Sequence, residues 1–244
     1  MRDIKDYTDK YNVPNFEDYQ VKYRRRKVLE VINTYQPRKI LEIGCGMEPL
    51  FDFIDKVSYD KWIVVEPSEI FWENAVKLAE NNSKITIIND YFGTGSLQLN
   101  NEWDLIICSG LLHEIEEPKD FLLEIRRICN GKTVVHINVP NANSFHRLLA
   151  QCMGIISDVH EKSERNKIYQ QNSVFDLNTL CKLVSESEFN IIDKGSYFLK
   201  PFTHSQMYKL MSEKIIDEKV LDGLYDLSQY MKEYGSEIFI NARI

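Results

Sequence analysis

Short, continuously apolar runs alternate along this chain with segments of helical periodicity. After Pro118, for example, Phe121, Leu122 and Ile125 recur at the spacing of one helix face. Runs that are apolar throughout and separated by helices indicate parallel strands covered on both sides. The pattern therefore predicts an α/β protein with a central parallel sheet. The apolar runs lie at residues 40–43, 61–66, 85–90, 103–109 and 133–139.

The first run carries a carboxylate and is followed by a glycine-rich turn, Glu42-x-Gly44-x-Gly46. Glycine lacks a Cβ, so it allows a sharp turn and lets the backbone approach a ligand closely. A dinucleotide-binding turn needs a third glycine three residues after the second, and this chain has Pro49 there. The turn therefore predicts a nucleotide-like ligand and argues against nicotinamide.

Polar residues also follow the next three predicted strands. Glu66 ends the second strand and lies 22 residues after Gly44, close to the spacing of about 20 expected for a ribose-binding carboxylate. Asp90 ends the third strand, and residues 109–113 follow the fourth. In an open α/β sheet the ligand lies outside the carboxyl ends of the strands. We therefore expect all four strand ends to meet at one site.

Residues 37–244 carry this set of motifs, and in that range the chain resembles class I S-adenosylmethionine-dependent methyltransferases. The resemblance implies a Rossmann-like fold with a mostly parallel, seven-stranded sheet of order 3-2-1-4-5-7-6. Residues 237–243 would supply the antiparallel strand that lies between the fifth and sixth. Residues 1–36 would form an N-terminal helical segment. Insertions at 140–175 and 201–234 would add a helical cap.

The resemblance also implies the cofactor, S-adenosylmethionine, with S-adenosylhomocysteine as its product. Glu42, Gly44 and Gly46 would hold the methionine moiety, Glu66 would bind the ribose and Asp90 the adenine. The residues after the fourth strand would pass beside the sulfonium. The expected cofactor-binding residues are Tyr19, Tyr23, Arg24, Glu42, Gly44, Cys45, Gly46, Glu66, Pro67, Asp90, Tyr91, Ser109, Gly110, Leu111 and His113.

Three of these residues belong to a basic, aromatic N-terminal stretch. A run of cations such as residues 22–27 is usually a solvated helix face, and that interpretation is favoured here. The run could instead meet the cofactor carboxylate or steer an anionic acceptor. Tyr19, Tyr23 and Arg24 are the expected exceptions to the solvated face.

The acceptor is expected to bind in the two insertions. The segment 140–175 is far longer than the roughly 2 to 6 residues usual for such a connection. Its start, residues 140–147, resembles small bacterial methyltransferases from surface-polysaccharide gene clusters. The resemblance implies a small hydroxyl or amine acceptor that is sugar-linked or phosphorylated. The expected acceptor-binding residues are Asn141, Asn143, Arg147, Lys200 and His204.

Three alternatives stay open for this function. The enzyme could be a ubiquinone-type or other small-metabolite O-methyltransferase, which a more apolar acceptor cavity would favour. It could methylate a phosphoramidate in capsule synthesis. It could also be a non-catalytic partner that supports a paralogous methyltransferase as a heterodimer, and a homodimer is equally open.

Histidines are the expected catalytic residues. Transfer from a sulfonium needs a positioned nucleophile and, for a hydroxyl, a base that works near neutral pH. His146 is ranked slightly ahead of His113 as that base. For each of the two histidines, a purely structural role is about as common as a catalytic one. His136, within the fifth strand, is expected to be a satisfied core residue. His204 ranks lower as a catalytic candidate.

Composition excludes several classes of function. A net charge of −7 argues against a general nucleic-acid binder, because phosphate contacts dominate such affinity. Five cysteines without a C-x-x-C pair indicate neither a disulfide framework nor a zinc site, and favour the reducing cytoplasm. No apolar run approaches the roughly 18 residues of a membrane span. Residues 158–164 lack the H-E-x-x-H spacing, and no metal is predicted.

Overall fold

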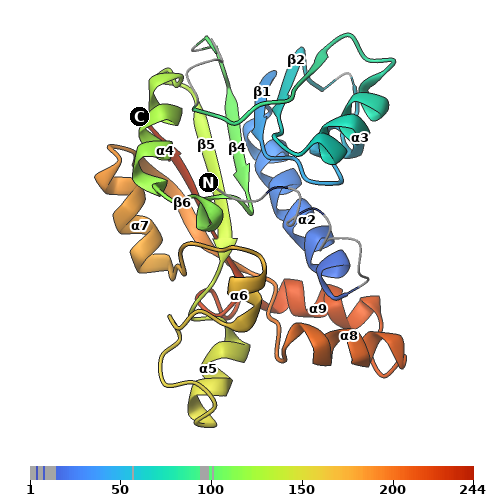
Figure 1. Ribbon diagram of the computed structural model, residues 1–244, viewed down its shortest axis with the longest axis vertical. Helices are drawn as coiled ribbons and strands as arrows, with labels where there is room; N and C mark the ends of the chain where they lie inside the picture. The colour runs from blue at the N-terminus through green and yellow to red at the C-terminus, as the bar shows by residue number, and fades with distance from the viewer. Residues whose placement is uncertain (1–3, 5–7, 9–14, 57, 94–98, 101) are drawn as a thin grey trace.

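The computed structural model describes residues 4, 8, 15–56, 58–93, 99–100 and 102–244. These residues form a seven-stranded sheet of order β3-β2-β1-β4-β5-β7-β6 (Figure 1). Strands β1 to β5 pair in parallel, and β7 is antiparallel to both β5 and β6. The predicted strand order is therefore confirmed. The strands are β1 (Lys39–Ile43), β2 (Lys61–Val65), β3 (Ile85–Ile88), β4 (Leu105–Ser109), β5 (Val134–Pro140), β6 (Asn190–Tyr197) and β7 (Glu237–Arg243).

Several helices begin at a residue that is suited to a helix start. Ser68 caps α3 by accepting from the Phe71 N–H, Pro118 opens α4, and Asp176 forms a capping box with Thr179 at α7. None of the helices in the described part of the chain is long and apolar enough to cross a membrane. The helices are α2 (Glu17–Tyr35), α3 (Glu69–Ala79), α4 (Pro118–Arg127), α5 (Phe145–Cys152), α6 (Glu164–Ile168), α7 (Leu177–Glu186), α8 (His204–Ser212) and α9 (Glu218–Leu227), with short 3-10 helices η2 (Leu50–Phe53) and η3 (Leu112–Glu114).

Apolar side chains cover both faces of the sheet, as continuously apolar strands require. On one face, Leu122 of α4 and Leu180 of α7 pack among residues of β1, β4, β5 and β7. On the other face, Val28 of α2 packs with Trp62 of β2. Strands β1, β2 and β4 are only five residues long, so burial on both faces supplies most of their stabilisation.

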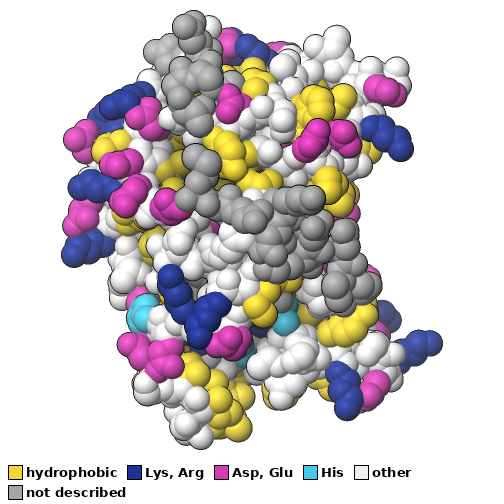
Figure 2. All heavy atoms as spheres, viewed as in Figure 1, with side chains coloured by type: hydrophobic (Ala, Val, Ile, Leu, Met, Phe, Trp, Pro, Cys, Tyr) yellow, Lys and Arg dark blue, Asp and Glu magenta, His cyan; other side chains and the backbone are white. Residues whose placement is uncertain are grey.

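Both predicted insertions carry helices at the same end of the molecule. Residues 201–234 contain α8 and α9, and residues 140–175 contain α5 and α6 (Figure 1). The α8–α9 pair packs on the start of α2, where Tyr23 stacks on Phe198 with ring centroids 4.5 Å apart. Hydrophobic side chains also gather over the turn after α5, where Ile155 is 67% exposed (Figure 2). The predicted helical cap is thus present. The division of the chain at residue 37 stays a prediction.

Gly235 sets the start of β7. A Cβ at this position would lie 2.4 Å from the Tyr197 carbonyl oxygen and 2.5 Å from the Tyr197 nitrogen. Both are backbone atoms, so no side-chain rotation can relieve the clash. Glycine alone lets the chain pass this close to β6, and the passage places Ser236 and Glu237 beside the carboxyl ends of the parallel strands.

We predict that Gly235→Ala lowers the free energy of unfolding by about 2 kcal/mol, as overpacking against fixed backbone does. Urea denaturation measures the change. Gly223→Ala is the control, because a Cβ there meets no heavy atom within 4 Å and alanine favours helix α9. Equal stability of the two variants would contradict the prediction.

Candidate functional site

A cavity of about 440 Å³ lies at the carboxyl ends of β1, β2 and β4, where the acid-tipped strands were expected to converge. Ten of the predicted cofactor-binding residues line it. They are Arg24, Glu42, Gly44, Cys45, Gly46, Glu66, Pro67, Ser109, Gly110 and Leu111. The sequence did not single out the other residues of the wall, which include Ser68, Met47, Leu50 and Phe71.

The glycine-rich turn has the backbone conformation that its sequence predicts. Gly44 and Gly46 have φ values of 74° and 60°, in the region that side chains with a Cβ rarely adopt. The turn is held by Glu66, whose Oε2 accepts from the N–H groups of Cys45 and Gly46 at 3.0 and 3.2 Å. Its Oε1 accepts from the Ser68 N–H at 2.9 Å. Burial raises the pKa of Glu66, although these three hydrogen bonds oppose the shift.

Glu42 lies beneath the turn and is 2% exposed. Its carboxyl oxygens accept from the Leu50 N–H at 3.2 Å and from the Trp62 indole at 3.0 Å. Burial nevertheless raises the pKa of Glu42 to about 8, and the nearby Glu66 adds to the shift. The cavity thus has an acid at its base that changes charge near neutral pH.

Five predicted cofactor-binding residues are not among the described residues that line this cavity. One of them, His113, lines the second cavity described below. Asp90 and Tyr91 follow β3 but are not among the described residues that line the cavity. Tyr23 is buried in the cap and donates to Asp222 at 3.0 Å. Tyr19 packs against the apolar cluster of the cap that contains Tyr23 and Phe198. The helical period of α2 turns both tyrosines toward the cap, whereas Arg24 reaches the cavity.

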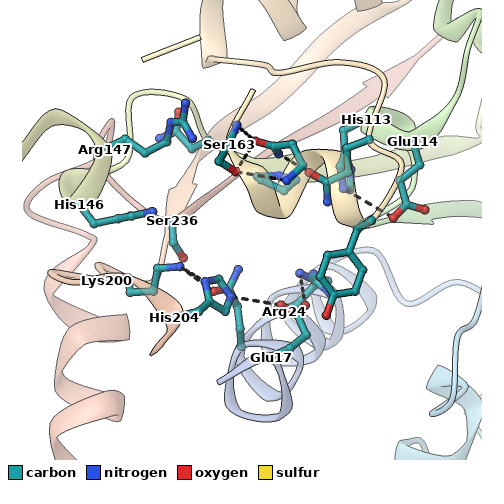
Figure 3. Close-up of a pocket in the computed structure, with 17 residues that line it drawn as sticks. Glu17, Arg24, His113, Glu114, His146, Arg147, Ser163, Lys200, His204 and Ser236 are labelled. Atoms are coloured by element: carbon teal, nitrogen blue, oxygen red, sulfur yellow. Dashed lines mark hydrogen bonds and ion pairs between the residues drawn. The ribbon is translucent and has the colours of Figure 1, made fainter. Parts of the chain in front are cut away.

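A second cavity, of about 120 Å³, adjoins the first and is mostly polar (Figure 3). Glu17, Arg24, Gly110 and Glu114 line both cavities, so they form the shared wall. The second cavity receives the two predicted catalytic histidines and four of the five predicted acceptor residues. Its lining includes His113, Asn141, His146, Arg147, Ser163, Asn166, Tyr169, Gln171, Lys200, His204 and Ser236.

Three histidines reach this cavity from η3, α5 and α8. His113 is buried, with its Nε2 3.8 Å from Glu114. Burial lowers the pKa of His146 well below its usual value, and Lys200, His204 and Arg147 lower it further. His146 is therefore neutral at physiological pH, as a proton acceptor must be.

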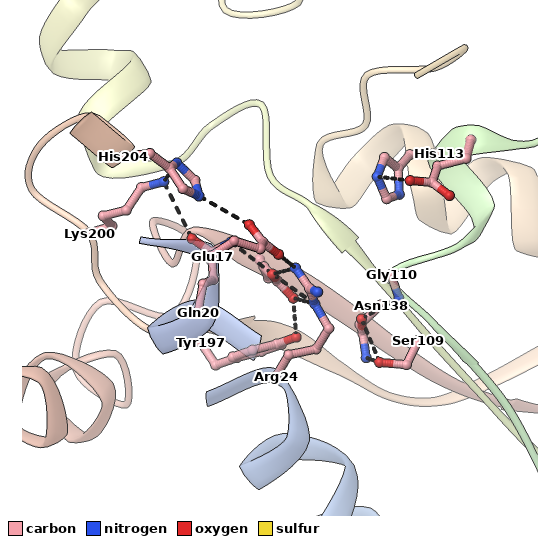
Figure 4. A network of polar contacts seen from close by, with 12 residues as sticks. Glu17, Gln20, Arg24, Ser109, Gly110, His113, Asn138, Tyr197, Lys200 and His204 are labelled. Atoms are coloured by element: carbon pink, nitrogen blue, oxygen red, sulfur yellow. Dashed lines mark hydrogen bonds and ion pairs between the residues drawn. The ribbon is translucent and has the colours of Figure 1, made fainter. Parts of the chain in front are cut away.

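His204 belongs to a partly buried chain of polar contacts (Figure 4). Its Nδ1 accepts from the Lys200 ammonium at 2.8 Å, and its Nε2 therefore carries the proton and donates to Glu17 at 3.2 Å. Glu17 also accepts from Arg24 at 3.0 Å. Arg24 makes further bonds to Glu237, which is completely buried.

A second chain of hydrogen bonds fixes the backbone beside the shared wall. His136 donates through Nδ1 to Asn241 at 2.7 Å and accepts through Nε2 from Asn138 at 3.0 Å. Asn138 in turn accepts from the Gly110 N–H at 2.8 Å (Figure 4). Burial lowers the pKa of His136 to about 4. The expectation that His136 is a satisfied core histidine is confirmed.

Several predicted acceptor residues already use their donors within the protein. Asn141 donates to the carbonyls of Glu233 and Gly235. Arg147 donates to the carbonyls of Val159 and Glu161. Asn143 is not among the described residues that line the cavity. Asn141 and Arg147 therefore shape the cavity wall by fixing loops.

Helical spacing could have identified two wall residues that sequence reasoning missed. Glu17 and Gln20 precede Arg24 by seven and four residues, on one face of α2. No comparable signal marks Asn166, Tyr169 or Gln171, which reach the cavity only through the path of the 140–175 insertion.

The histidine in the 158–164 stretch binds acids within the protein. His160 contacts Asp158 and Asp176, each at 3.2 Å. Asp176 is also the cap of α7. Across the described part of the chain, no three His, Cys, Asp or Glu side chains form a group that could hold a metal ion.

The larger cavity fits a nucleoside joined to an amino acid. It combines a turn with two glycines, a buried acid at its base, Glu42, and a second acid after the end of β2, Glu66. The adjoining polar cavity leads away from the shared wall. Two adjoining cavities that share a wall are suited to the transfer of a group from a bound cofactor to a second small molecule.

Comparisons with known proteins agree with this interpretation. Residues 18–194 match a family model described as a methyltransferase domain. No curated protein shows a significant match. Among solved structures, the N-methyltransferase NodS from Bradyrhizobium japonicum WM9 in complex with S-adenosyl-L-homocysteine is 10% identical, with a TM-score of 0.56 over 96% of this chain and 90% of that chain.

Two further structures share the fold. The 1,6-didemethyltoxoflavin-N1-methyltransferase from Burkholderia thailandensis is 11% identical, with a TM-score of 0.60 over 93% of this chain and 86% of that chain. The [4+2]-cyclase SpnF is 12% identical, with a TM-score of 0.57 over 89% and 79%. At this identity the likeness is one of fold. The family match covers most of the chain, which therefore belongs to the class I S-adenosylmethionine-dependent methyltransferases.

Proposed function

We propose that the protein transfers a methyl group from S-adenosylmethionine to a hydroxyl or amine of a small polar acceptor that carries a sugar or a phosphate. The observation that carries the proposal is the pair of adjoining cavities with a shared wall at Glu17, Arg24, Gly110 and Glu114. The cofactor supplies an electrophilic methyl group, so positioning is the main task of the protein.

On the cofactor side, the proposal assigns the methionine moiety to Gly44 and Gly46, with Glu42 near its ammonium. Glu66 would accept from the ribose hydroxyls, and Oε1 accepts only one described backbone N–H. Asp90 and Tyr91 stay predictions for the adenine, since they follow β3 outside the described cavity wall.

On the acceptor side, the proposal assigns the base to His113 ahead of His146. The methyl group must cross the shared wall, and His113 lies on the same short segment as Gly110 and Glu114, which line both cavities. His146 comes from α5 and lines the second cavity only. A positioned base contributes about 10²- to 10⁴-fold to rate.

The polar lining of the second cavity supports a polar acceptor over a quinone-like one. The surface-polysaccharide setting, including phosphoramidate methylation, rests on the sequence resemblance at residues 140–147. A cytoplasmic location rests on cysteine usage. Because a [4+2]-cyclase shares the fold, fold alone does not fix the reaction, and binding and turnover must be measured.

We predict that S-adenosylhomocysteine binds the protein stoichiometrically, and that Glu66→Gln weakens binding about tenfold or more. The amide removes the charge and one acceptor oxygen, and a hydrogen bond to a charged group contributes roughly 1.5–3 kcal/mol. Calorimetric titration measures both. Glu69→Gln is the matched control, because Glu69 is exposed and outside the described cavity wall. The absence of binding to the unaltered protein would sink the proposed function.

Binding should also depend on pH through Glu42. Its pKa of about 8 means that it is mostly protonated at pH 6 and mostly ionised above pH 8. The ionised form attracts the ligand ammonium, so affinity for S-adenosylhomocysteine should rise by about tenfold from pH 6 to pH 8.5 if binding lowers that pKa by one unit. Titrations across this range test the rise. Glu42→Gln should flatten the profile, and a rise that survives the substitution would contradict the assignment.

The two histidines should separate kinetically once an acceptor is found by screening with radiolabelled cofactor. His113→Gln should lower kcat about 100-fold, because it removes the base. His146→Gln should mainly raise KM. Unchanged S-adenosylhomocysteine binding in both variants is the control for folding. An unchanged kcat in His113→Gln would show that His113 is not the base.

A further inference from the structure

Two buried polar atoms in the second cavity have no hydrogen-bond partner among the described residues. They are the hydroxyl Oγ of Ser236 and the ring Nδ1 of His146. Ser236 is 4% exposed and immediately precedes β7. Figure 3 shows the ring of His146 reaching toward Ser236, with Lys200 nearby. Buried polar atoms without partners are rare in folded proteins, and those that line a cavity are suited to bind a ligand.

The basic and the acidic side chains of the second cavity lie in different parts of it. Lys200, Arg147 and His204 are the charged or ionisable groups that act on the His146 ring, and all three are basic. The acids of the cavity lie at the shared wall. Glu17 accepts from Arg24 and His204, and Glu114 lies beside His113.

Two more acids lie behind Arg147, outside the cavity. Asp158 and Glu161 act on the charge of Arg147, and the side chain of Glu161 accepts from Ser157. Neither acid belongs to the described cavity lining. The basic side chains Lys200 and Arg147 therefore lie around Ser236 and His146, and the acids of the lining lie at the shared wall.

We propose that Ser236 and His146 form a subsite for an anionic oxygen group of the acceptor, a carboxylate or a phosphate ester. The hydroxyl of Ser236 and the Nδ1–H of neutral His146 would donate to its oxygens, and Lys200 and Arg147 would offset its charge. The inference rests on the proposed methyl transfer and deepens it.

This subsite also orients the acceptor. An anion held at the basic end leaves the remainder of the molecule directed toward Gly110 and His113 at the shared wall. The small size of the cavity, about 120 Å³, restricts the other orientations. Ser236 is thus a specificity residue that acts on binding, distinct from the base.

The test titrates inorganic phosphate, and separately acetate, into protein saturated with S-adenosylhomocysteine at constant ionic strength. Long-range ¹H–¹⁵N spectra of the histidine rings report the event, with His146→Gln used to assign the His146 signals. We expect a saturable change in these signals with at least one anion. Ser236→Ala should weaken the apparent affinity about tenfold, because a hydrogen bond to a charged group is lost.

Ser144→Ala is the matched control. Ser144 is also buried and its Oγ also lacks a partner among the described residues, but it is not part of the described cavity lining. Both alanine variants should unfold at the same or a higher urea concentration than the unaltered protein, since each removes an unpaired buried hydroxyl. Only Ser236→Ala should change anion binding.

The outcomes separate the two proposals. Failure of S-adenosylhomocysteine to bind would overturn the proposed function. Normal cofactor binding without a saturable response to either anion would overturn the subsite alone, as would equal effects of Ser236→Ala and Ser144→Ala. A response to phosphate but not acetate would support the subsite and assign it to phosphate esters, and the reverse would assign it to carboxylates.

Discussion

A buried ion pair between Arg24 and Glu237 ties the N-terminal helix to the last strand, and the two-cavity arrangement depends on it. Glu237 is completely buried and also accepts from Gln20 and Tyr197. Such a pair is tolerated only when its charges are fully hydrogen-bonded, and the loss of one partner is costly. Because Arg24 packs over Gly110, the pair holds α2 across the carboxyl edge of the sheet. Arg24 and Gly110 both belong to the wall that the two cavities share.

Local sequence patterns predicted the sheet and the backbone of the glycine-rich turn well. The last strand begins and ends at the predicted residues 237 and 243, and the turn at Gly44 and Gly46 adopts the positive φ that its glycines allow. These features depend on a few consecutive residues. The prediction for Tyr23 was wrong because its orientation depends on a contact between segments that are far apart in the sequence. Its ring packs against Phe198 and so does not reach the cavity.

The acceptor side was harder to predict because its side chains compete for the same hydrogen bonds. Asn141 was expected to bind the acceptor, yet its amide donates to two backbone carbonyls. Ser236 belongs to no motif, and only the tertiary structure shows that its buried hydroxyl has no partner among the described residues. The sequence shows which hydrogen-bond donors a loop contains, but only the tertiary structure shows which of them already have a partner within the protein. Backbone turns therefore define the wall of the larger cavity, whereas the second cavity is defined by polar side chains whose partners only the tertiary structure shows.

We propose that cofactor and acceptor meet at the wall formed by Glu17, Arg24, Gly110 and Glu114. A crystal structure with S-adenosylhomocysteine bound tests it most directly. We expect the ligand to fill the 440 Å³ cavity, with its sulfur at this wall and facing the second cavity. A ligand whose sulfur points away from Gly110, or that lies outside the larger cavity, would show that the two molecules do not meet at this wall.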